Sequence, residues 1–266
     1  LGIVIKTVGD RKKAKELIEK GLTIYTTHLP NNHDEIAWAL LNLGDIYRNL
    51  GNYEQAIDVL EQSLLIFKKN SPDNYIGKAR ALLYLGTVYR DLSEYKKAIT
   101  ILEESFSIYQ KYVSKDHLRI ARILVHMGNL YRELGNYKKA KDLIDQSLTI
   151  YKGTFSEDHI DVGWTLTYLA MVYTDSEKYE EAIDVLEQSL KIHKKTYLES
   201  HIEMAWVLSH LGDAYKNLAQ YQKAEILFEK SLKIYELHYG KDHIETARVL
   251  IGLGQVYMLK GNLEIA

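Results

Sequence analysis

The histidines of this sequence are candidates for a metal or catalytic site, because imidazole binds metals and transfers protons near neutral pH. A metal site on a helix needs two ligands three or four residues apart, on one face. No two histidines have that spacing; His201 and His210, nine apart, would lie on opposite faces of a helix. Five histidines instead share one position of a repeating pattern: His33, His117, His159, His201 and His243. We expect these five to pack at or cap helix starts, and we expect no metal site.

The sequence also lacks the usual catalytic motifs. It has no P-loop, no G-x-S-x-G, no H-E-x-x-H and no Rossmann glycine pattern. The absence of cysteine excludes thiolate nucleophiles and disulfides. Carboxylates such as Glu54, Asp58 and Glu61 occur at positions expected to be solvated. We therefore predict no enzymatic activity and no cofactor.

A third set of residues is of the types that bind other proteins. Arginine and aromatic residues, which are enriched at interface hot spots, recur every 42 residues at the positions equivalent to 38, 42, 45 and 48. Positions 38, 42, 45 and 49, with offsets of 4, 3 and 4, form one helical face, and position 48 flanks it. The predicted partner-binding residues are Trp38, Asn42, Arg48, Arg80, Tyr84, Arg90, Arg122, His126, Asn129, Arg132, Trp164, Tyr168, Trp206, His210 and Lys216.

These residue types indicate the chemistry of the partner. Arginine pairs with carboxylates bidentately, and aromatic rings stack on side chains or cover backbone. Tyr84, His126, Tyr168 and His210 are predicted to form a ladder of planar groups. We expect an extended or helical peptide, or a protein segment, that carries acidic and aromatic residues. A site elsewhere, such as the convex face, and a role as a spacer remain open.

A strict 42-residue repeat positions all of these residues, and fixed periods of this kind indicate repeat architectures. No insertion or deletion interrupts it. The framework consists of a small residue, a tyrosine three residues later, an alanine and a serine. Its members are Gly44, Gly86, Gly128, Ala170, Gly212 and Gly254; Tyr47, Tyr89, Tyr131, Tyr173, Tyr215 and Tyr257; Ala56, Ala98, Ala140, Ala182, Ala224 and Ala266; and Ser63, Ser105, Ser147, Ser189 and Ser231.

Each repeat predicts two helices, helix A over about 33–50 and helix B over about 53–69. Small residues would let A and B approach closely. The expected helix A caps are Asn32, Asn74, Asp116, Asp158, Ser200 and Asp242. Glycine in the left-handed conformation is expected to end helix A at Gly51, Gly135 and Gly261. The equivalent turns at Ser93, Glu177 and Ala219 are less clearly signalled.

Leu40, Leu43, Gly44, Tyr47, Ala56, Leu60 and Ser63 resemble the signature of the tetratricopeptide repeat (TPR) family. The 42-residue period, and units such as Asp242 to Ala247, are similar to the kinesin light chain type. The resemblance implies an all-α, right-handed α-solenoid whose A helices line a concave, partner-binding groove. It covers residues 1–266 as one domain of about six repeats.

The ends of the sequence fall inside repeats. Leu1 and Gly2 align with Leu43 and Gly44, and Ala266 aligns with Ala56. We therefore expect both terminal repeats to be incomplete and the sequence to be a fragment of a longer protein. End-to-end self-association through these incomplete repeats is an open alternative.

Composition narrows the function further. The formal net charge is −2 and the pI is about 6.6, which argues against a general nucleic-acid binder. No run of 18 apolar residues occurs, so no membrane span is expected. We predict a cytoplasmic protein-interaction scaffold or adaptor that binds neither nucleic acid nor membrane. The alternative is a sensor segment of a larger signalling protein with an attached nucleotide-binding or effector domain.

Overall fold

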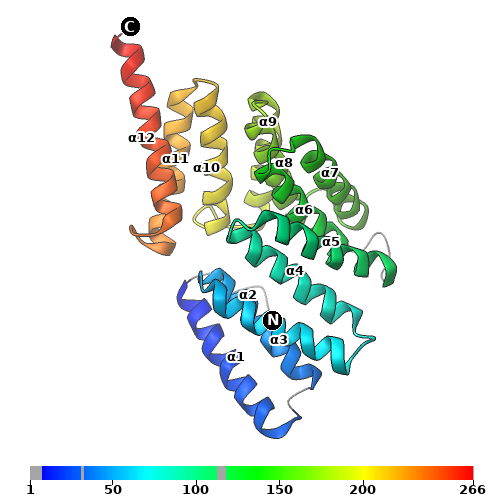
Figure 1. The fold of residues 1–266 in the computed structure, drawn as a ribbon. Coiled ribbons are helices and arrows are strands. Elements are labelled where there is room, and N and C mark those ends of the chain that lie inside the picture. Colours follow the sequence, from blue (N-terminus) through cyan, green and yellow to red (C-terminus); the bar gives the residue numbers. More distant parts are fainter. Residues whose placement is uncertain (1–7, 31–32, 113–117, 266) are drawn as a thin grey trace. The chain divides into compact units, whose positions relative to one another are not determined.

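The structure is a computed structural model, and it describes residues 8–30, 33–112 and 118–265. Within these ranges the regular secondary structure is entirely α-helical (Figure 1), which confirms the predicted all-α class. The helices are α1 (Val8–His28), α2 (Asp34–Asn49), α3 (Tyr53–Asn70), α4 (Tyr75–Asp91), α5 (Tyr95–Tyr112), α6 (Leu118–Glu133), α7 (Tyr137–Thr154), α8 (Ile160–Asp175), α9 (Tyr179–Thr196), α10 (Ile202–Asn217), α11 (Tyr221–Tyr239) and α12 (Ile244–Ile265).

Even-numbered helices are the predicted A helices, and odd-numbered helices are the B helices. The first complete pair, α2 and α3, matches the predicted ranges to within a residue or two. The most extensive contacts join the A and B helices of one repeat, such as α2 with α3 and α10 with α11. The chain forms two compact units, one up to Leu130 and one from Tyr131 onward. A single solenoid over 1–266 stays a prediction.

Small residues on the A helices let the B helices approach closely, as the sequence predicts. A Cβ atom on Gly44 would overlap the side chain of Leu60. A Cβ atom on Gly86 would lie 2.6 Å from Cδ2 of Leu102. Both leucines are fully buried, and a close-packed interior cannot easily move them aside. The glycine slot is therefore a requirement of A–B packing in these repeats.

The recurring serine of helix B has an equally definite partner. Each described serine is fully buried, and in four of the repeats its hydroxyl donates to a backbone carbonyl of the preceding A helix. A buried hydroxyl without a partner would be costly, so this bond explains why serine is retained at the A–B interface. The bonds are Ser63 to Ala37 (2.7 Å), Ser105 to Ala79 (2.7 Å), Ser189 to Gly163 (2.7 Å) and Ser231 to Ala205 (2.8 Å).

The starts of the A helices differ in part from the prediction. Asn74 caps α4 as expected, its Oδ1 accepting the N–H of Gly77 at 2.9 Å. For α8 and α10, however, the predicted caps Asp158 and Ser200 are one residue too early, because His159 and His201 are the cap residues. His33 likewise caps α2. At the start of α12, His243 rather than Asp242 makes the capping bond. Asn32, Asp116 and His117 lie outside the described residues.

The histidine caps have a clear physical basis. Nδ1 of each ring accepts the backbone N–H of the residue two positions further on, at 3.2 to 3.3 Å. This satisfies one of the amide groups that a helix start leaves without a partner. Three of the rings also stack on the preceding aromatic residue: Phe155 with His159 (3.7 Å between centroids), Tyr197 with His201 (4.0 Å) and Tyr239 with His243 (4.0 Å). The expected structural role of these histidines is confirmed at the described positions.

The ends of the A helices use left-handed backbone whether or not glycine is present. Gly51 and Gly135 have φ values of 76° and 74° as predicted. Ser93, Glu177 and Ala219 adopt φ values of 61°, 60° and 55° at the equivalent position. The helix end predicted at Gly261 is wrong, because α12 continues to Ile265. Elsewhere a B helix of at least 18 residues packs against the A helix and favours the turn, whereas only five residues follow Gly261 in this sequence.

Candidate partner-binding stripe on the A helices

The predicted partner-binding residues lie along the A helices, and we refer to positions 38, 42, 45 and 48 and their equivalents as the A-helix stripe. On α2 the stripe alternates with buried core residues: Leu41 and Leu43 are buried while Asn42 is exposed. In the other repeats, most stripe residues are only partly buried. The two units are considered separately, up to Leu130 and from Tyr131 onward.

In the first unit, Arg80 lies between two aromatic rings of the stripe. Its guanidinium carbon is 5.2 Å from the centroid of Trp38 on α2 and 5.9 Å from that of Tyr84 on its own helix. Its Nη2 also donates to the Tyr84 hydroxyl at 3.4 Å. Trp38 packs edge-on against Phe67 of α3, with 5.1 Å between centroids. These contacts hold the guanidinium group of Arg80 and the rings of Trp38 and Tyr84 in defined positions.

Next along the same unit, Asp91 links two arginines. Arg48 Nη1 on α2 is 3.2 Å from Asp91 Oδ2, and Arg90 Nη2 on α4 is 2.6 Å from Asp91 Oδ1. Arg48 also lies 3.5 Å from Asp45. Because Asp91 joins consecutive A helices, part of the cationic charge here serves packing.

His126 and Arg122 continue the stripe on α6. Nδ1 of His126 is 3.4 Å from Nη1 of Arg90. Burial, followed by the nearby guanidinium groups of Arg90, Arg48 and Arg122, lowers the pKa of His126 well below its usual value. The ring is therefore neutral at physiological pH. Arg122 is exposed, whereas Asn129 is buried, with 7% of its surface exposed, and offers a partner little area.

In the second unit, the stripe carries a cluster of aromatic rings from α8 and α10, which we call the aromatic cluster: Trp164, Tyr168, Trp206 and His210. Trp206 is the ring that all the others contact. Its centroid lies 5.1 Å from Trp164, 5.3 Å from Tyr168 and 5.2 Å from His210. The sequence predicted that Tyr168 and His210 are successive steps of a ladder of planar groups. In the structure both rings contact Trp206, which lies between them in the cluster. All four residues are partly exposed.

Basic residues of the second unit are matched by acidic ones. Lys216 Nζ lies 2.9 Å from Asp213 and 2.8 Å from Gln255 Oε1. Arg132 forms ion pairs with Glu133 and Asp175. Asp175 belongs to the next A helix, so this pair repeats the Arg48–Asp91 arrangement of the first unit.

His210 has an unusual environment within the aromatic cluster. Burial lowers its pKa to about 3, with further contributions from Arg248 and Arg132. Its Nε2 is a buried atom without a hydrogen-bond partner among the residues that the structure describes. Buried polar atoms normally have partners, so this nitrogen is an exception among the groups of the cluster.

Rings on the B helices support the stripe from behind, and they were not among the predicted site residues. Phe67 and His193 occupy the same repeat position on the B helices, and each packs edge-on against a stripe tryptophan. Position 67 and its equivalents carry a ring in every repeat, in Phe67, Tyr109, Tyr151, His193 and Tyr235. That regularity was the available signal. Asp175 was also missed, although it stands one residue after the last stripe position.

The described residues contain no group of three or more histidine, aspartate or glutamate side chains that could hold a metal ion. None of the helices, as far as they are described, is long and apolar enough to cross a membrane. The stripe therefore offers rings, arginines and carboxylates as its recognition groups.

Comparison with known families identifies the repeat. The tetratricopeptide repeat family model matches residues 1–69, 35–111, 77–153, 119–195, 161–237 and 203–266. The chain belongs to the tetratricopeptide repeat family. Overlapping matches that together span the sequence confirm the resemblance seen in the framework residues.

Solved TPR structures share the fold at low sequence identity. BtubC (BKLC) from P. vanneervenii superposes with a TM-score of 0.67 at 16% identity, covering 86% of this chain and 91% of its own. A Podosopora anserina protein with nearly identical TPR-like repeats of the kinesin light chain type gives a TM-score of 0.60 at 23% identity, covering 78% and 98%. A Rap protein complexed with Competence and Sporulation Factor gives 0.66 at 15% identity, covering 94% and 72%. No curated protein matches the sequence.

Proposed function

We propose that this TPR protein is an interaction scaffold that binds a peptide or protein segment along the A-helix stripe. The observation that carries the proposal is the aromatic cluster of α8 and α10. Three large rings and an imidazole are gathered on one face, and all are partly exposed. Tryptophan and tyrosine dominate interface hot spots because they bury a large area.

The rings of the cluster are already held by their neighbours. Trp206 contacts three other rings, and Trp164 is backed by His193 of α9. A partner that packs on a preorganised surface loses less side-chain entropy than one that must order it. The cluster is therefore suited to an aromatic or large aliphatic side chain of the partner.

The stripe of the first unit favours acidic groups. Its positions carry four arginines, Arg48, Arg80, Arg90 and Arg122, and one aspartate, Asp45; Asp91 next to the stripe adds a second carboxylate. Arg122 is exposed and has no partner among the side chains described in this unit. Arginine at an exposed site can pair with a carboxylate bidentately. We therefore expect acidic residues in the segment bound by this unit.

The Rap structure supports this kind of function by analogy of fold, since that protein is seen with Competence and Sporulation Factor bound. In the same way, we infer a peptide-sized or protein-segment partner for this chain. The groove location and the preference for acidic and aromatic residues are our proposals.

Peptide display against the whole chain tests the aromatic part. We expect enriched peptides to carry an aromatic or large aliphatic residue, and Tyr168→Ala to weaken their binding at least tenfold, or about 1.4 kcal/mol. Tyr179→Ala, which removes a partly buried tyrosine at the start of α9 outside the stripe, should change binding less than twofold. Equal losses in both variants would place the binding site elsewhere.

Arg122→Glu tests the charged part. Arg90 and Arg132 are less suitable because both form ion pairs with carboxylates of the A helices. Reversal of the exposed Arg122 should reduce binding of acidic peptides by several-fold, while Lys96→Glu on the exposed side of α5 should not. If acidic peptides are never enriched, the charge preference is wrong and the aromatic part stands alone.

A further inference from the structure

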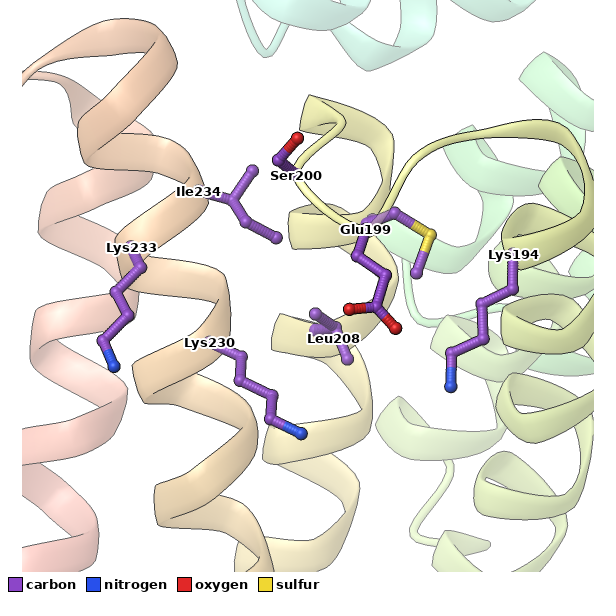
Figure 2. A pocket seen from close by; sticks show the side chains of 8 residues that line it. Lys194, Glu199, Ser200, Leu208, Lys230, Lys233 and Ile234 are labelled. Carbon is purple, nitrogen blue, oxygen red and sulfur yellow. The ribbon is translucent and has the colours of Figure 1, made fainter.

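A pocket in the second unit lies away from the A-helix stripe. It has a volume of about 330 Å³ and forms where the end of α9, the loop before α10, α10 itself and the middle of α11 meet (Figure 2). Its floor consists of Met204, Leu208 and Ile234, which are 2%, 7% and 8% exposed. The pocket is therefore a hollow directly above core side chains.

Helical geometry separates this pocket from the stripe. At 100° per residue, Trp206 and His210 point about 200° and 240° around α10 from Met204, whereas Leu208 is only about 40° away. The pocket thus opens between the B helices α9 and α11, on the side of α10 that faces away from the aromatic cluster. A ligand here would not contact the stripe.

Three lysines surround the apolar floor. Lys194 comes from α9, and Lys230 and Lys233 come from α11. None of their ammonium groups has an ion-pair or hydrogen-bond partner among the side chains described around them. Glu199 is the acidic residue of the lining, and in the view of Figure 2 its carboxylate lies between the ammonium groups of Lys194 and Lys230.

The repeat itself does not require these lysines. The position of Lys194 is occupied by Lys68 in the first unit, and that of Lys230 by Glu104. There the two side chains form an ion pair across α3 and α5, with 3.8 Å between Lys68 Nζ and Glu104 Oε1. In the second unit, lysine replaces the glutamate, so an ion pair is exchanged for two like charges beside an apolar hollow.

We infer that this pocket is a second binding site, which takes an acidic peptide segment with one large aliphatic side chain. The aliphatic side chain packs on Met204, Leu208 and Ile234, and flanking carboxylates neutralise Lys194, Lys230 and Lys233. The volume accommodates one such side chain together with adjacent backbone. The inference goes beyond the proposed function and does not depend on it.

Methionine methyl NMR on the whole chain distinguishes the two sites. Met204 forms part of the pocket floor, and Met171 occupies a stripe position on α8. The probe is an acetylated and amidated pentapeptide with a central leucine and two glutamates on each side. We expect a saturable shift of the Met204 methyl signal and little change at Met171. Peptides with a central alanine, or with lysines in place of the glutamates, should bind at least fivefold more weakly.

Charge variants test the role of the lysines. Lys230→Glu restores the residue pair found at Lys68 and Glu104, and it should weaken the peptide by about three- to tenfold. Glu199→Gln removes a competing carboxylate and should strengthen binding by about two- to fivefold. Lys241→Glu, an equal change of charge at an exposed position outside the pocket, should alter binding less than twofold.

Several results would overturn the inference. A shift at Met171 without one at Met204 would place the peptide on the stripe, and no shift at either would leave the pocket without this ligand. Equal effects of Lys230→Glu and Lys241→Glu would remove the charge argument. A Met204 shift that depends on protein concentration alone would identify a second copy of the chain as the occupant. Tighter binding of decanoate than of any peptide would identify a small amphiphilic acid instead.

Discussion

His126 and His210 occupy the same position of the A-helix stripe, in different units, and both are kept neutral by burial and nearby guanidinium groups. Other histidines have another role, because Nδ1 of His33, His159 or His201 accepts a backbone N–H at a helix start. One residue type therefore occurs both on the proposed partner-binding stripe and at helix caps. The neighbours of each ring decide which role it has.

The low pKa of His210 predicts a pH-dependent stability. The unfolded chain binds a proton at this residue near pH 6.5, but the folded chain does not until about pH 3. Between these values the unfolded state holds more protons, so the free energy of unfolding falls as the pH falls, by up to about 1.4 kcal/mol per pH unit from this residue. In urea titrations from pH 7 to 4.5, His210→Gln should lose stability less steeply than the parent.

The control for that titration is His28→Gln, which removes an exposed histidine at the end of α1. Identical slopes for the parent and His210→Gln would mean that His210 titrates normally in the folded protein.

At the level of the elements, the turns that end the A helices show that backbone conformation is set by packing of the whole repeat. Ala219 adopts a left-handed φ of 55°, although nothing in its side chain favours it. The same conformation at Gly51 is free of this strain. Non-glycine residues are therefore placed there at some cost in stability, which the A–B interface offsets.

Ala219→Gly should stabilise the protein. Relief of the left-handed strain favours the variant by about 1–2 kcal/mol, and the greater freedom of glycine in the unfolded chain offsets about 0.4–1 kcal/mol. We expect a net gain of about 0.5–1 kcal/mol, measured by urea unfolding. Ala247→Gly, at an exposed helical position of α12, should instead cost about 1 kcal/mol. A loss of stability in Ala219→Gly would show that the turn is not strained.

Most of the helical framework could be predicted from the sequence, because it depends on local patterns repeated in each unit. The 42-residue spacing of Gly44, Tyr47 and Ser63 locates both helices and their interface. Helix caps were harder, since Asp158 is a better cap by residue type than His159, and the stacking of His159 on Phe155 that favours the histidine is a contact between rings.

The candidate site was less predictable, for a physical reason. The sequence identifies which residues share a helical face, but their partners come from other helices. Arg48 pairs with Asp91 from the next A helix, 43 residues later, so pairing follows from packing. The pocket above Met204 was not predicted at all, because it depends on the gap between two B helices.

At the scale of the whole molecule, a repeat protein is stabilised mainly by contacts between adjacent repeats. The extensive helix contacts here join consecutive helices, such as α3 with α4 and α9 with α10. Each unit has its own buried residues, for example Leu124 in the first and Leu211 in the second. Damage to one repeat should therefore remain local.

Leu124→Ala tests that expectation. Leu124 is 2% exposed in α6, and its truncation should cost about 2–5 kcal/mol. Amide hydrogen exchange should accelerate around α6 and remain close to that of the parent in α10 and α11. Uniform acceleration along the chain would instead show that the two units unfold as one cooperative body.

The three tryptophans of this chain, Trp38, Trp164 and Trp206, all lie on the A-helix stripe. The intrinsic fluorescence of the unlabelled protein is therefore an optical signal from that surface. A partner that covers the stripe should change the tryptophan emission. A ligand in the lysine-rimmed pocket, whose lining has no tryptophan, should leave the emission unchanged. The tryptophans of the proposed binding surface thus also provide a signal for partner binding.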